Sequence, residues 1–285
     1  MSEKSKDAGS GKKPRHARPF LKWAGGKRQL LPELIKRLPG SFRNYHEPFL
    51  GGGALFFELA ARGLLKKKAY LSDLNEELIE TYIVVQTGVE DLIKSLKKHV
   101  HDEEYYYRLR GVDPASLDIV ERASRLIYLN KTCFNGLYRV NSKGEFNVPF
   151  GNYKNPMICD EENLRLCSAA LKDISIRRQS YFKVMSGALR GDFVYFDPPY
   201  HPVSKTASFA SYQKDGFDEK DQQRLKDIFE ALDRKKCFAM LSNSHSAFTK
   251  GLYKDYKPEI VEASRAVNSR ASARGPVKEI IVRNY

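Results

Sequence analysis

Three consecutive glycines, Gly51-Gly52-Gly53, follow a predicted strand and restrict the fold more than any other feature of the chain. The strand lies near residues 44–47, and a helix from about 54 to 62 follows the glycines. A second strand at about 68–72 then ends at Asp73, 22 positions after Gly51. A strand, a glycine loop, a helix and a strand that ends in an acid are typical of a nucleotide-binding α/β unit. The pattern predicts an α/β sheet with a ligand at the carboxyl ends of its strands.

The glycine loop does not match the phosphate-binding loop of NTPases. That loop needs Lys and then Ser or Thr after its last glycine, and here Ala54 and Leu55 follow. The other candidate, Lys27, is followed by Arg28 where the hydroxyl should be. Glycines let the backbone approach a ligand closely, and Asp73 can accept hydrogen bonds from a ribose diol. NAD and S-adenosylmethionine both carry that diol, so this spacing leaves both cofactors open.

Strands and helices alternate on both sides of a long middle section. Further strands are predicted at residues 174–177, 193–196, 238–242, 259–262 and 279–282, and further helices at 29–37, 160–170 and 219–232. This order predicts a mostly parallel α/β sheet. Residues 75–130 show helical spacing, and 133–151 alternate around Asn141–Gly144 as in a β-hairpin. We expect one catalytic domain, residues 19–74 and 166–285, with the section 75–165 inserted into it.

The predicted strand Phe193–Phe196 leads directly into Asp197-Pro198-Pro199-Tyr200. Open α/β sheets bind their ligands at such a strand end. Two prolines stiffen the turn and remove two backbone donors, so their carbonyls remain to accept hydrogen bonds. Asp197 and the Pro198 carbonyl are then two acceptors beside the Tyr200 ring, a set that fits a planar ring with an exocyclic amine. Methyl transfer to an amine uses such a set and hydride transfer does not, which favours S-adenosylmethionine over NAD.

The net charge of +14 predicts a polyanionic partner, and nucleic acid is the default. Residues 1–18, which we expect to be a disordered basic tail, contribute only +4, so +10 remains in the rest of the chain. The four cysteines form no Cys-x-x-Cys pair, which indicates reduced thiols, no metal site and a cytoplasmic protein. No apolar run approaches the roughly 20 residues of a membrane span.

With these residues in place, the chain from about Pro19 to Tyr285 resembles the Dam family of DNA adenine methyltransferases, in its α-type arrangement and its GATC-reading members. Five motifs in the family's order carry the resemblance: Phe20–Lys27, Glu47–Gly53, Ser72–Asn75, Phe134–Gly151 and Asp197–Tyr200. The resemblance implies a Rossmann-like methyltransferase sheet, S-adenosylmethionine as cofactor and a target-recognition domain at 75–165. It also implies methylation of the 6-amino group of an adenine that is flipped out of double-stranded DNA, within GATC.

The resemblance also assigns site residues. The catalytic residues are Asp197, Pro198 and Tyr200. The cofactor-binding residues are Trp23, Lys27, Phe49, Gly51, Gly53, Asp73, Phe182 and Asp197. The DNA-binding residues are Lys22, Asn135, Leu137, Arg139, Asn141 and Pro149, and Arg139 is expected to read a guanine through its planar fork. Two alternatives stay open: Lys27 as an ordinary lysine at a helix start, and Arg139 as a phosphate contact. We expect Arg265, Arg270 and Arg274 to clamp phosphates.

Two other functions remain to be weighed. One is a sequence-specific DNA-binding protein that has lost catalysis, against which the intact Asp73 and Asp197–Tyr200 argue. The other is an amino-methyltransferase that acts on RNA or on cytosine, since the same pocket chemistry suits both. We further expect a monomer at the nucleoid, with a cognate restriction endonuclease as a separate partner.

Overall fold

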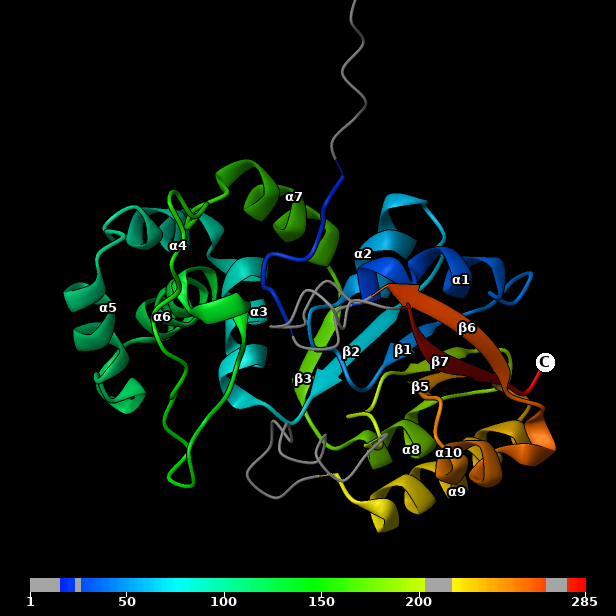
Figure 1. Ribbon diagram of the computed structural model, residues 1–285. Coiled ribbons are helices and arrows are strands. Elements are labelled where there is room, and N and C mark those ends of the chain that lie inside the picture. The colour runs from blue at the N-terminus through cyan, green and yellow to red at the C-terminus, as the bar shows by residue number, and fades with distance from the viewer. Residues whose placement is uncertain (1–15, 24–26, 203–216, 265–275) are drawn as a thin grey trace, which may run out of the picture.

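The computed structural model describes residues 16–23, 27–202, 217–264 and 276–285. Its strands form one seven-stranded sheet in the order β3-β2-β1-β4-β5-β7-β6 (Figure 1). The strands are β1 (Tyr45–Glu47), β2 (Ala69–Asp73), β3 (Ser175–Arg178), β4 (Phe193–Phe196), β5 (Phe238–Ser244), β6 (Glu259–Ser264) and β7 (Pro276–Arg283). The pairs from β3 to β5 are parallel, and β7 is antiparallel to both of its neighbours. The prediction of a mostly parallel, Rossmann-like α/β sheet is confirmed.

The helices follow the predicted alternation closely, with ends that differ by one or two residues from those expected. They are α1 (Leu31–Lys36), α2 (Ala54–Ala61), α3 (Glu76–Thr87), α4 (Val89–Leu96), α5 (Glu103–Arg110), α6 (Ile119–Thr132), α7 (Glu161–Leu171), α8 (Val184–Gly187), α9 (Glu219–Arg234) and α10 (Ala247–Leu252). The sequence pattern does not predict α8 and α10, which have only 4 and 6 residues. No helix in the described ranges is long and apolar enough to cross a membrane.

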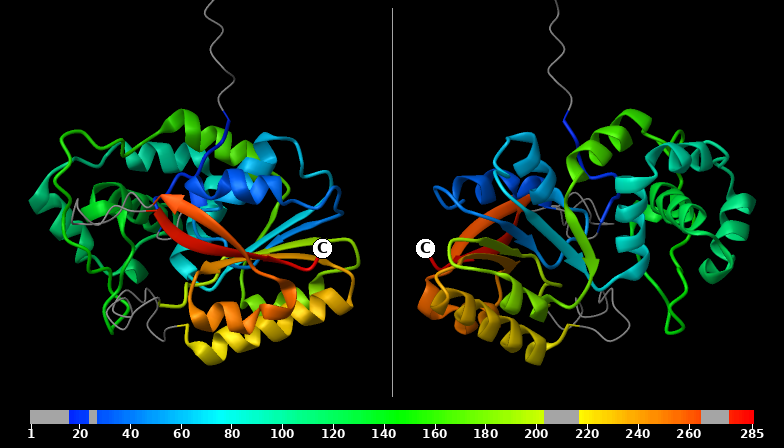
Figure 2. Two further views of the ribbon diagram at one scale, coloured as in Figure 1. Left: turned by 45° about the vertical axis from the view of Figure 1, so that its right-hand side comes forward. Right: turned by 180° about the vertical axis from the view of Figure 1, so that it is seen from behind.

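Two apolar clusters cover the two faces of the sheet. Side chains alternate along β4, so Phe193 and Tyr195 belong to one cluster, and Val194 and Phe196 belong to the other. Helices α1 and α2 lie over the first face, and α8, α9 and α10 lie over the second (Figures 1 and 2). The carboxyl ends of the parallel strands are therefore left at one edge, between the sheet and the section that contains α4, α5 and α6.

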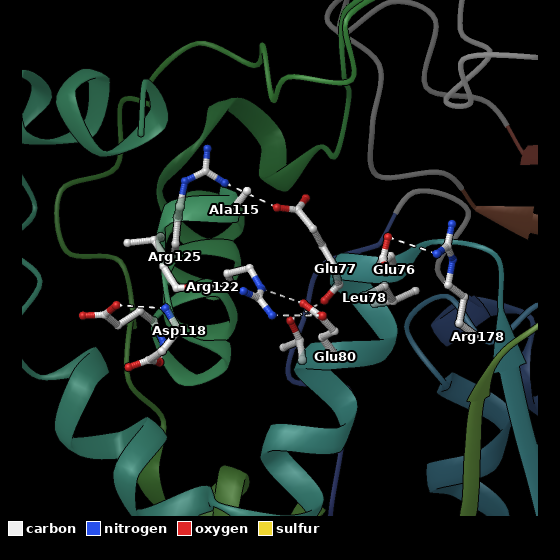
Figure 3. Close-up of polar contacts among 12 residues, drawn as sticks. Glu76, Glu77, Leu78, Glu80, Ala115, Asp118, Arg122, Arg125 and Arg178 are labelled. Carbon is white, nitrogen blue, oxygen red and sulfur yellow. Dashed lines mark hydrogen bonds and ion pairs between the residues drawn. The ribbon is translucent and has the colours of Figure 1, made fainter. Parts of the chain in front are cut away.

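Helix α3 ties that helical section to the sheet. Arg122 of α6 forms an ion pair with Glu80 of α3, with 2.8 Å between the guanidinium nitrogen and the carboxylate oxygen (Figure 3). At its N-terminal end, α3 offers Glu76 to Arg178 of β3 at 3.1 Å. Both pairs are partly or largely solvent-exposed and contribute little free energy individually. Their value is geometric, because they fix α6 relative to the edge of the sheet.

Residues 133–151, here called the recognition segment, do not form the regular β-hairpin that their alternation predicts. The described chain has only two isolated antiparallel bridges here, Cys133 with Phe150 and Val140 with Phe146. A 3-10 turn at Phe134–Gly136 interrupts the ladder between them. The segment still turns back on itself, because the Asn141 N–H donates to the Glu145 carbonyl at 2.9 Å.

Two buried asparagine amides hold the N-terminal segment 18–22 against this section. The Asn130 amide of α6 accepts from the Lys22 N–H at 2.8 Å and donates to the Lys22 carbonyl at 2.7 Å. The Asn163 amide of α7 forms the same pair of bonds with Arg18, at 3.1 and 2.9 Å. Each amide replaces the strand partner that this extended segment lacks, so the segment is placed by α6 and α7.

Candidate active site

The glycine loop after β1 and the carboxylate after β2 form the first part of the site. Asp73 accepts a hydrogen bond from the Gly51 N–H at 3.0 Å, and the Tyr82 hydroxyl donates to the Gly51 carbonyl at 3.2 Å. Gly51 has φ +46°, and a Cβ atom there would lie 2.9 Å from Cδ1 of Trp23. A side chain at this position would therefore both strain the backbone and displace Trp23. Gly53 caps the N-terminus of α2 in a left-handed conformation.

An aromatic wall stands beside the glycine loop. Phe49 stacks on Tyr181 with ring centroids 5.0 Å apart, and Tyr181 stacks on Phe182 at 4.3 Å. Phe217 meets Phe49 edge-on at 5.8 Å. Phe182 is 41% exposed, so one aromatic face is open to a ligand. The sequence identifies Phe49 and Phe182 but gives no sign of Phe217, which lies before α9 and far from any motif.

These features fit S-adenosylmethionine. The glycines permit close approach of the backbone, the open aromatic face suits an adenine ring, and a carboxylate suits the ribose diol. Burial raises the pKa of Asp73, while its hydrogen bonds from the Asn75 and Gly51 N–H groups lower it. The described part of the chain holds no cluster of three or more His, Cys, Asp or Glu side chains that could bind a metal ion.

Asp197, directly after β4, is at the centre of the second part of the site. Lys27 Nζ lies 2.7 Å from Asp197 Oδ1 and 4.2 Å from the centroid of the Tyr200 ring. Ser242 Oγ donates to the same Oδ1 at 3.1 Å. Burial raises the pKa of Asp197, and the Lys27 ammonium acts against it. Lys27 is therefore a buried partner of the acid and not an ordinary lysine at a helix start.

The two prolines are fixed differently. Pro198 is buried, and the Pro199 carbonyl accepts a hydrogen bond from Gln222 Nε2 of α9 at 3.0 Å. The His201 N–H donates to Asn243 Oδ1 of β5 at 3.1 Å. The turn after Asp197 is thus held by side chains from α9 and β5, which the local sequence does not indicate.

Polar side chains on the neighbouring strands support Asp197 and Tyr200 from below. The Tyr200 hydroxyl donates to Glu279 Oε2 of β7 at 2.8 Å. Tyr195 and Ser242 hydroxyls are 2.8 Å apart. In the β5–β7 register Ser244 pairs with Glu279, and Ser242 lies two residues earlier on the same face. Sequence reasoning missed Ser242 and Glu279; the only signal was a polar residue within an otherwise apolar strand.

Glu47, the last residue of β1, is a further buried acid on this face. It is 2% exposed, and the Tyr45 hydroxyl donates to it at 2.8 Å. Burial raises the pKa of Glu47 to about 8, with a smaller contribution from the negative charge of Asp197. The side chain is therefore mainly protonated at neutral pH. The sequence places it in a motif but does not reveal its protonation.

Trp23 connects the glycine loop with the recognition segment. Its ring stacks on Tyr138 with centroids 4.8 Å apart and planes 23° apart. The Tyr138 hydroxyl donates to Glu77 of α3 at 3.1 Å, and Arg125 of α6 lies 3.5 Å from the same carboxylate (Figure 3). A continuous chain of contacts therefore runs from α6 through Tyr138 and Trp23 to Gly51.

The predicted DNA-binding residues lie on or against the recognition segment. Lys22 packs on Gly136 and reaches the Tyr153 ring, with its Nζ 4.6 Å from the centroid. Arg139 is exposed, and its guanidinium donates to the side chain and carbonyl of Asn147, at 2.7 and 3.2 Å.

The other four predicted DNA-binding residues differ in what surrounds them. Asn135 is exposed with φ +56°, and Pro149 is exposed. Leu137 packs partly against the core. Asn141 uses its amide to hold the turn at the tip, accepting from the Lys143 and Glu145 N–H groups at 2.9 and 3.0 Å. The expected phosphate clamps Arg265, Arg270 and Arg274 lie outside the described residues, as does most of the tail 1–18.

Comparison with known proteins identifies the family. The sequence profile described as D12 class N6 adenine-specific DNA methyltransferase matches residues 23–267. The Type II methyltransferase M1.LlaDCHI of Lactococcus lactis subsp. cremoris is 48% identical over 94% of this chain and 95% of its own length. The Type II methyltransferase M.MjaIII of Methanocaldococcus jannaschii is 42% identical over 94% of this chain and 99% of its own length. The DNA adenine methylase of Escherichia coli is 33% identical over 93% and 94%. With this match and the sheet and site described above, the chain belongs to the D12 class of N6 adenine-specific DNA methyltransferases and uses S-adenosylmethionine as its methyl donor.

Proposed function

We propose that this methyltransferase acts on an adenine flipped out of the duplex within GATC, and that Asp197, Pro198 and Tyr200 carry the reaction. The observation that supports the proposal most is the buried acid Asp197, held between Lys27 and Ser242 beside the Tyr200 ring. An amine inside a base pair cannot reach this position, so the base must leave the stack, at a cost of a few kcal/mol.

In this proposal the adenine amine donates one hydrogen to Asp197 and the other to the Pro198 carbonyl. Lys27 and Ser242 both contact Oδ1, so the amine meets the other carboxylate oxygen, Oδ2. The nitrogen lone pair is normally delocalised into the purine ring. Holding both hydrogens out of the ring plane directs the lone pair towards the methyl group. Positive charge then develops on the nitrogen, and acceptors that are already in place stabilise it.

The cofactor supplies a methyl group that is activated by its sulfonium charge. We assign its ribose diol to Asp73, its adenine ring to the wall of Phe49 and Phe182, and the close approach of its chain to Gly51 and Gly53. Trp23 lies over Gly51 and offers an aromatic face to the cationic centre. Because Trp23 also stacks on Tyr138, cofactor and DNA binding share one contact.

We assign the reading of GATC to the recognition segment. Arg139 is exposed and offers a planar fork that suits the major-groove edge of guanine, and Asn147 holds that fork in one orientation. Lys22, Asn135, Leu137, Asn141 and Pro149 complete the proposed contact surface. The alternative for Arg139 is a phosphate contact, and the experiment below separates the two.

We also propose that the protein works as a monomer on chromosomal DNA in the cytoplasm, next to a separate cognate endonuclease. Two of the relatives are named as Type II methyltransferases, and such enzymes protect DNA from a matching nuclease. A catalytically silent DNA-binding protein is disfavoured by the complete set of Asp73, Asp197 and Tyr200. Action on RNA or on cytosine lacks a supporting feature in the recognition segment.

Initial rates of methyl transfer to short duplexes test the assignment. Asp197→Asn and Tyr200→Ala should lower the rate by more than tenfold on every duplex while DNA affinity changes little, because affinity comes mainly from phosphates. Arg139→Ala should keep the rate on GATC within reach of the wild type but lose about tenfold to a hundredfold of its preference over a duplex with the guanine pair changed. An Arg139→Ala enzyme with an intact preference would make Arg139 a phosphate contact. Methylation of RNA or cytosine at a comparable rate would refute the substrate.

A further inference from the structure

The loops before the strands, at the edge of the sheet opposite the active site, are all basic. We call the cations in four of these loops the basic rim. It consists of Arg43 before β1, Lys66, Lys67 and Lys68 before β2, Arg190 before β4, and Lys235 and Lys236 before β5. Because these four strands are parallel neighbours, their amino ends meet at one edge of the sheet.

Backbone hydrogen bonds join the four loops into one continuous surface. The Lys68 carbonyl accepts from the Tyr45 N–H at 3.0 Å, and the Arg43 N–H donates to the Gly191 carbonyl at 2.8 Å. The Gly191 N–H in turn donates to the Lys236 carbonyl at 3.0 Å. The order of the loops along the rim therefore follows the order β2-β1-β4-β5 in the sheet.

All seven side chains of the basic rim are exposed, and no carboxylate of the described residues forms an ion pair with any of them. The acids that are closest in the sequence are engaged elsewhere. Asp192 is buried against His46 at 3.0 Å, and Asp233 accepts from the Asn284 amide at 3.1 Å. The rim thus presents positive charge that the fold itself does not neutralise.

The rim is remote from the active site. Strand β5 has 7 residues, and at about 3.3 Å per residue it alone separates the two edges by about 20 Å. The left view of Figure 2 shows the amino ends of the strands on the right and the section with α4, α5 and α6 on the left. DNA that is read by the recognition segment therefore faces the other side of the domain.

We propose that the basic rim binds the phosphate backbone of a second duplex segment while the active site holds the first. The recognised chemistry is a row of phosphates, because the rim offers only exposed Lys and Arg donors and no apolar or base-stacking surface. The enzyme's substrate is itself a long polyanion, so a second segment of the same molecule is present at high local concentration. The rim lets the enzyme pass between segments of one DNA without releasing both.

A bridging experiment tests this inference. The wild-type enzyme is placed on an immobilised duplex with one target site, and the capture of a labelled duplex without a target site is measured at 0.1 M salt. The rim variant is Lys66→Gln, Lys67→Gln, Lys68→Gln. The matched control is Lys94→Gln, Lys97→Gln, Lys98→Gln, which removes three exposed lysines from α4 and the turn after it.

The rim variant should capture the second duplex at least about tenfold less well, since one phosphate contact is worth about 0.9 log units per decade of salt. Its methylation rate on a short duplex should stay within twofold of the wild type, and the control should capture normally. Equal capture by the rim variant and the wild type overturns the proposal, as does an equal loss in the control. Capture of heparin or anionic vesicles by the rim without capture of duplex DNA also overturns it. None of these outcomes depends on the GATC assignment.

Discussion

Glu279→Ala removes the acceptor that holds the Tyr200 hydroxyl at 2.8 Å, and the loss can be predicted from that bond. Glu279 is 5% exposed, so the carboxylate acts in a protein environment and not in bulk water. A hydrogen bond to a charged group contributes about 1.5–3 kcal/mol. If the bond serves to hold the Tyr200 ring against the flipped base, this range corresponds to a rate loss of about tenfold to 150-fold.

Two further variants separate position from charge. Glu279→Gln keeps an acceptor for the hydroxyl but loses the negative charge, so it should recover part of the rate. Tyr200→Phe keeps the ring and loses only the donor, so it should resemble Glu279→Ala. The double variant should be no slower than either single variant, because both remove the same bond.

The assay combines single-turnover methyl transfer with the fluorescence of 2-aminopurine at the target position, which reports on the flipped base. Loss of the bond should lower both the rate and the flipped population. Additive losses in the double variant, or a normal flipped population in Glu279→Ala, would refute the positioning role. A merely structural role would instead lower the thermal stability of Glu279→Ala and Glu279→Gln alike.

Three other predictions concern stability and DNA binding. Between about pH 4.5 and 8 the folded state keeps the Glu47 proton that the unfolded state loses, so wild-type stability should fall with pH relative to Glu47→Gln, by at most about 1.4 kcal/mol per unit; urea unfolding from pH 5 to 8 measures this. Gly136→Ala should cost about 1–2 kcal/mol of stability, because φ is +63° and the new Cβ would lie 2.3 Å from Lys22 Cδ; it should also weaken DNA binding in a gel-shift assay by moving Lys22. Removal of residues 1–15, which carry five Lys or Arg against two acids, should weaken binding and flatten its salt dependence without changing the methylated sequence, which methylome sequencing checks.

The sequence predicts the parts of this molecule that local patterns determine. The apolar run of β4 ends at Asp197, and the glycines after β1 precede α2, because each of these signals lies within a few residues. The contacts that complete the site are long-range. Glu279 reaches Tyr200 from a strand 79 positions later, through an antiparallel register that no local pattern specifies.

The recognition segment shows the opposite error. Its alternating residues suggest a regular ladder, but the ladder is broken where Gly136 turns under Lys22. The stacking of Trp23 on Tyr138 joins residues from distant parts of the chain. Such a contact depends on the placement of α6, which the ion pairs with α3 determine. A sequence pattern can name both aromatic residues but cannot bring them together.

The asparagine amides that hold segment 18–22 have a consequence for the design of chimeric enzymes. Asn130 and Asn163 bind the backbone of Lys22 and Arg18, so this short N-terminal stretch is structurally part of the inserted section although the chain order separates them. A graft of residues 75–165 from a relative with another target sequence would meet a foreign stretch at 18–22. Exchange of specificity between relatives therefore requires two fragments to be transplanted together, the N-terminal stretch and the insert.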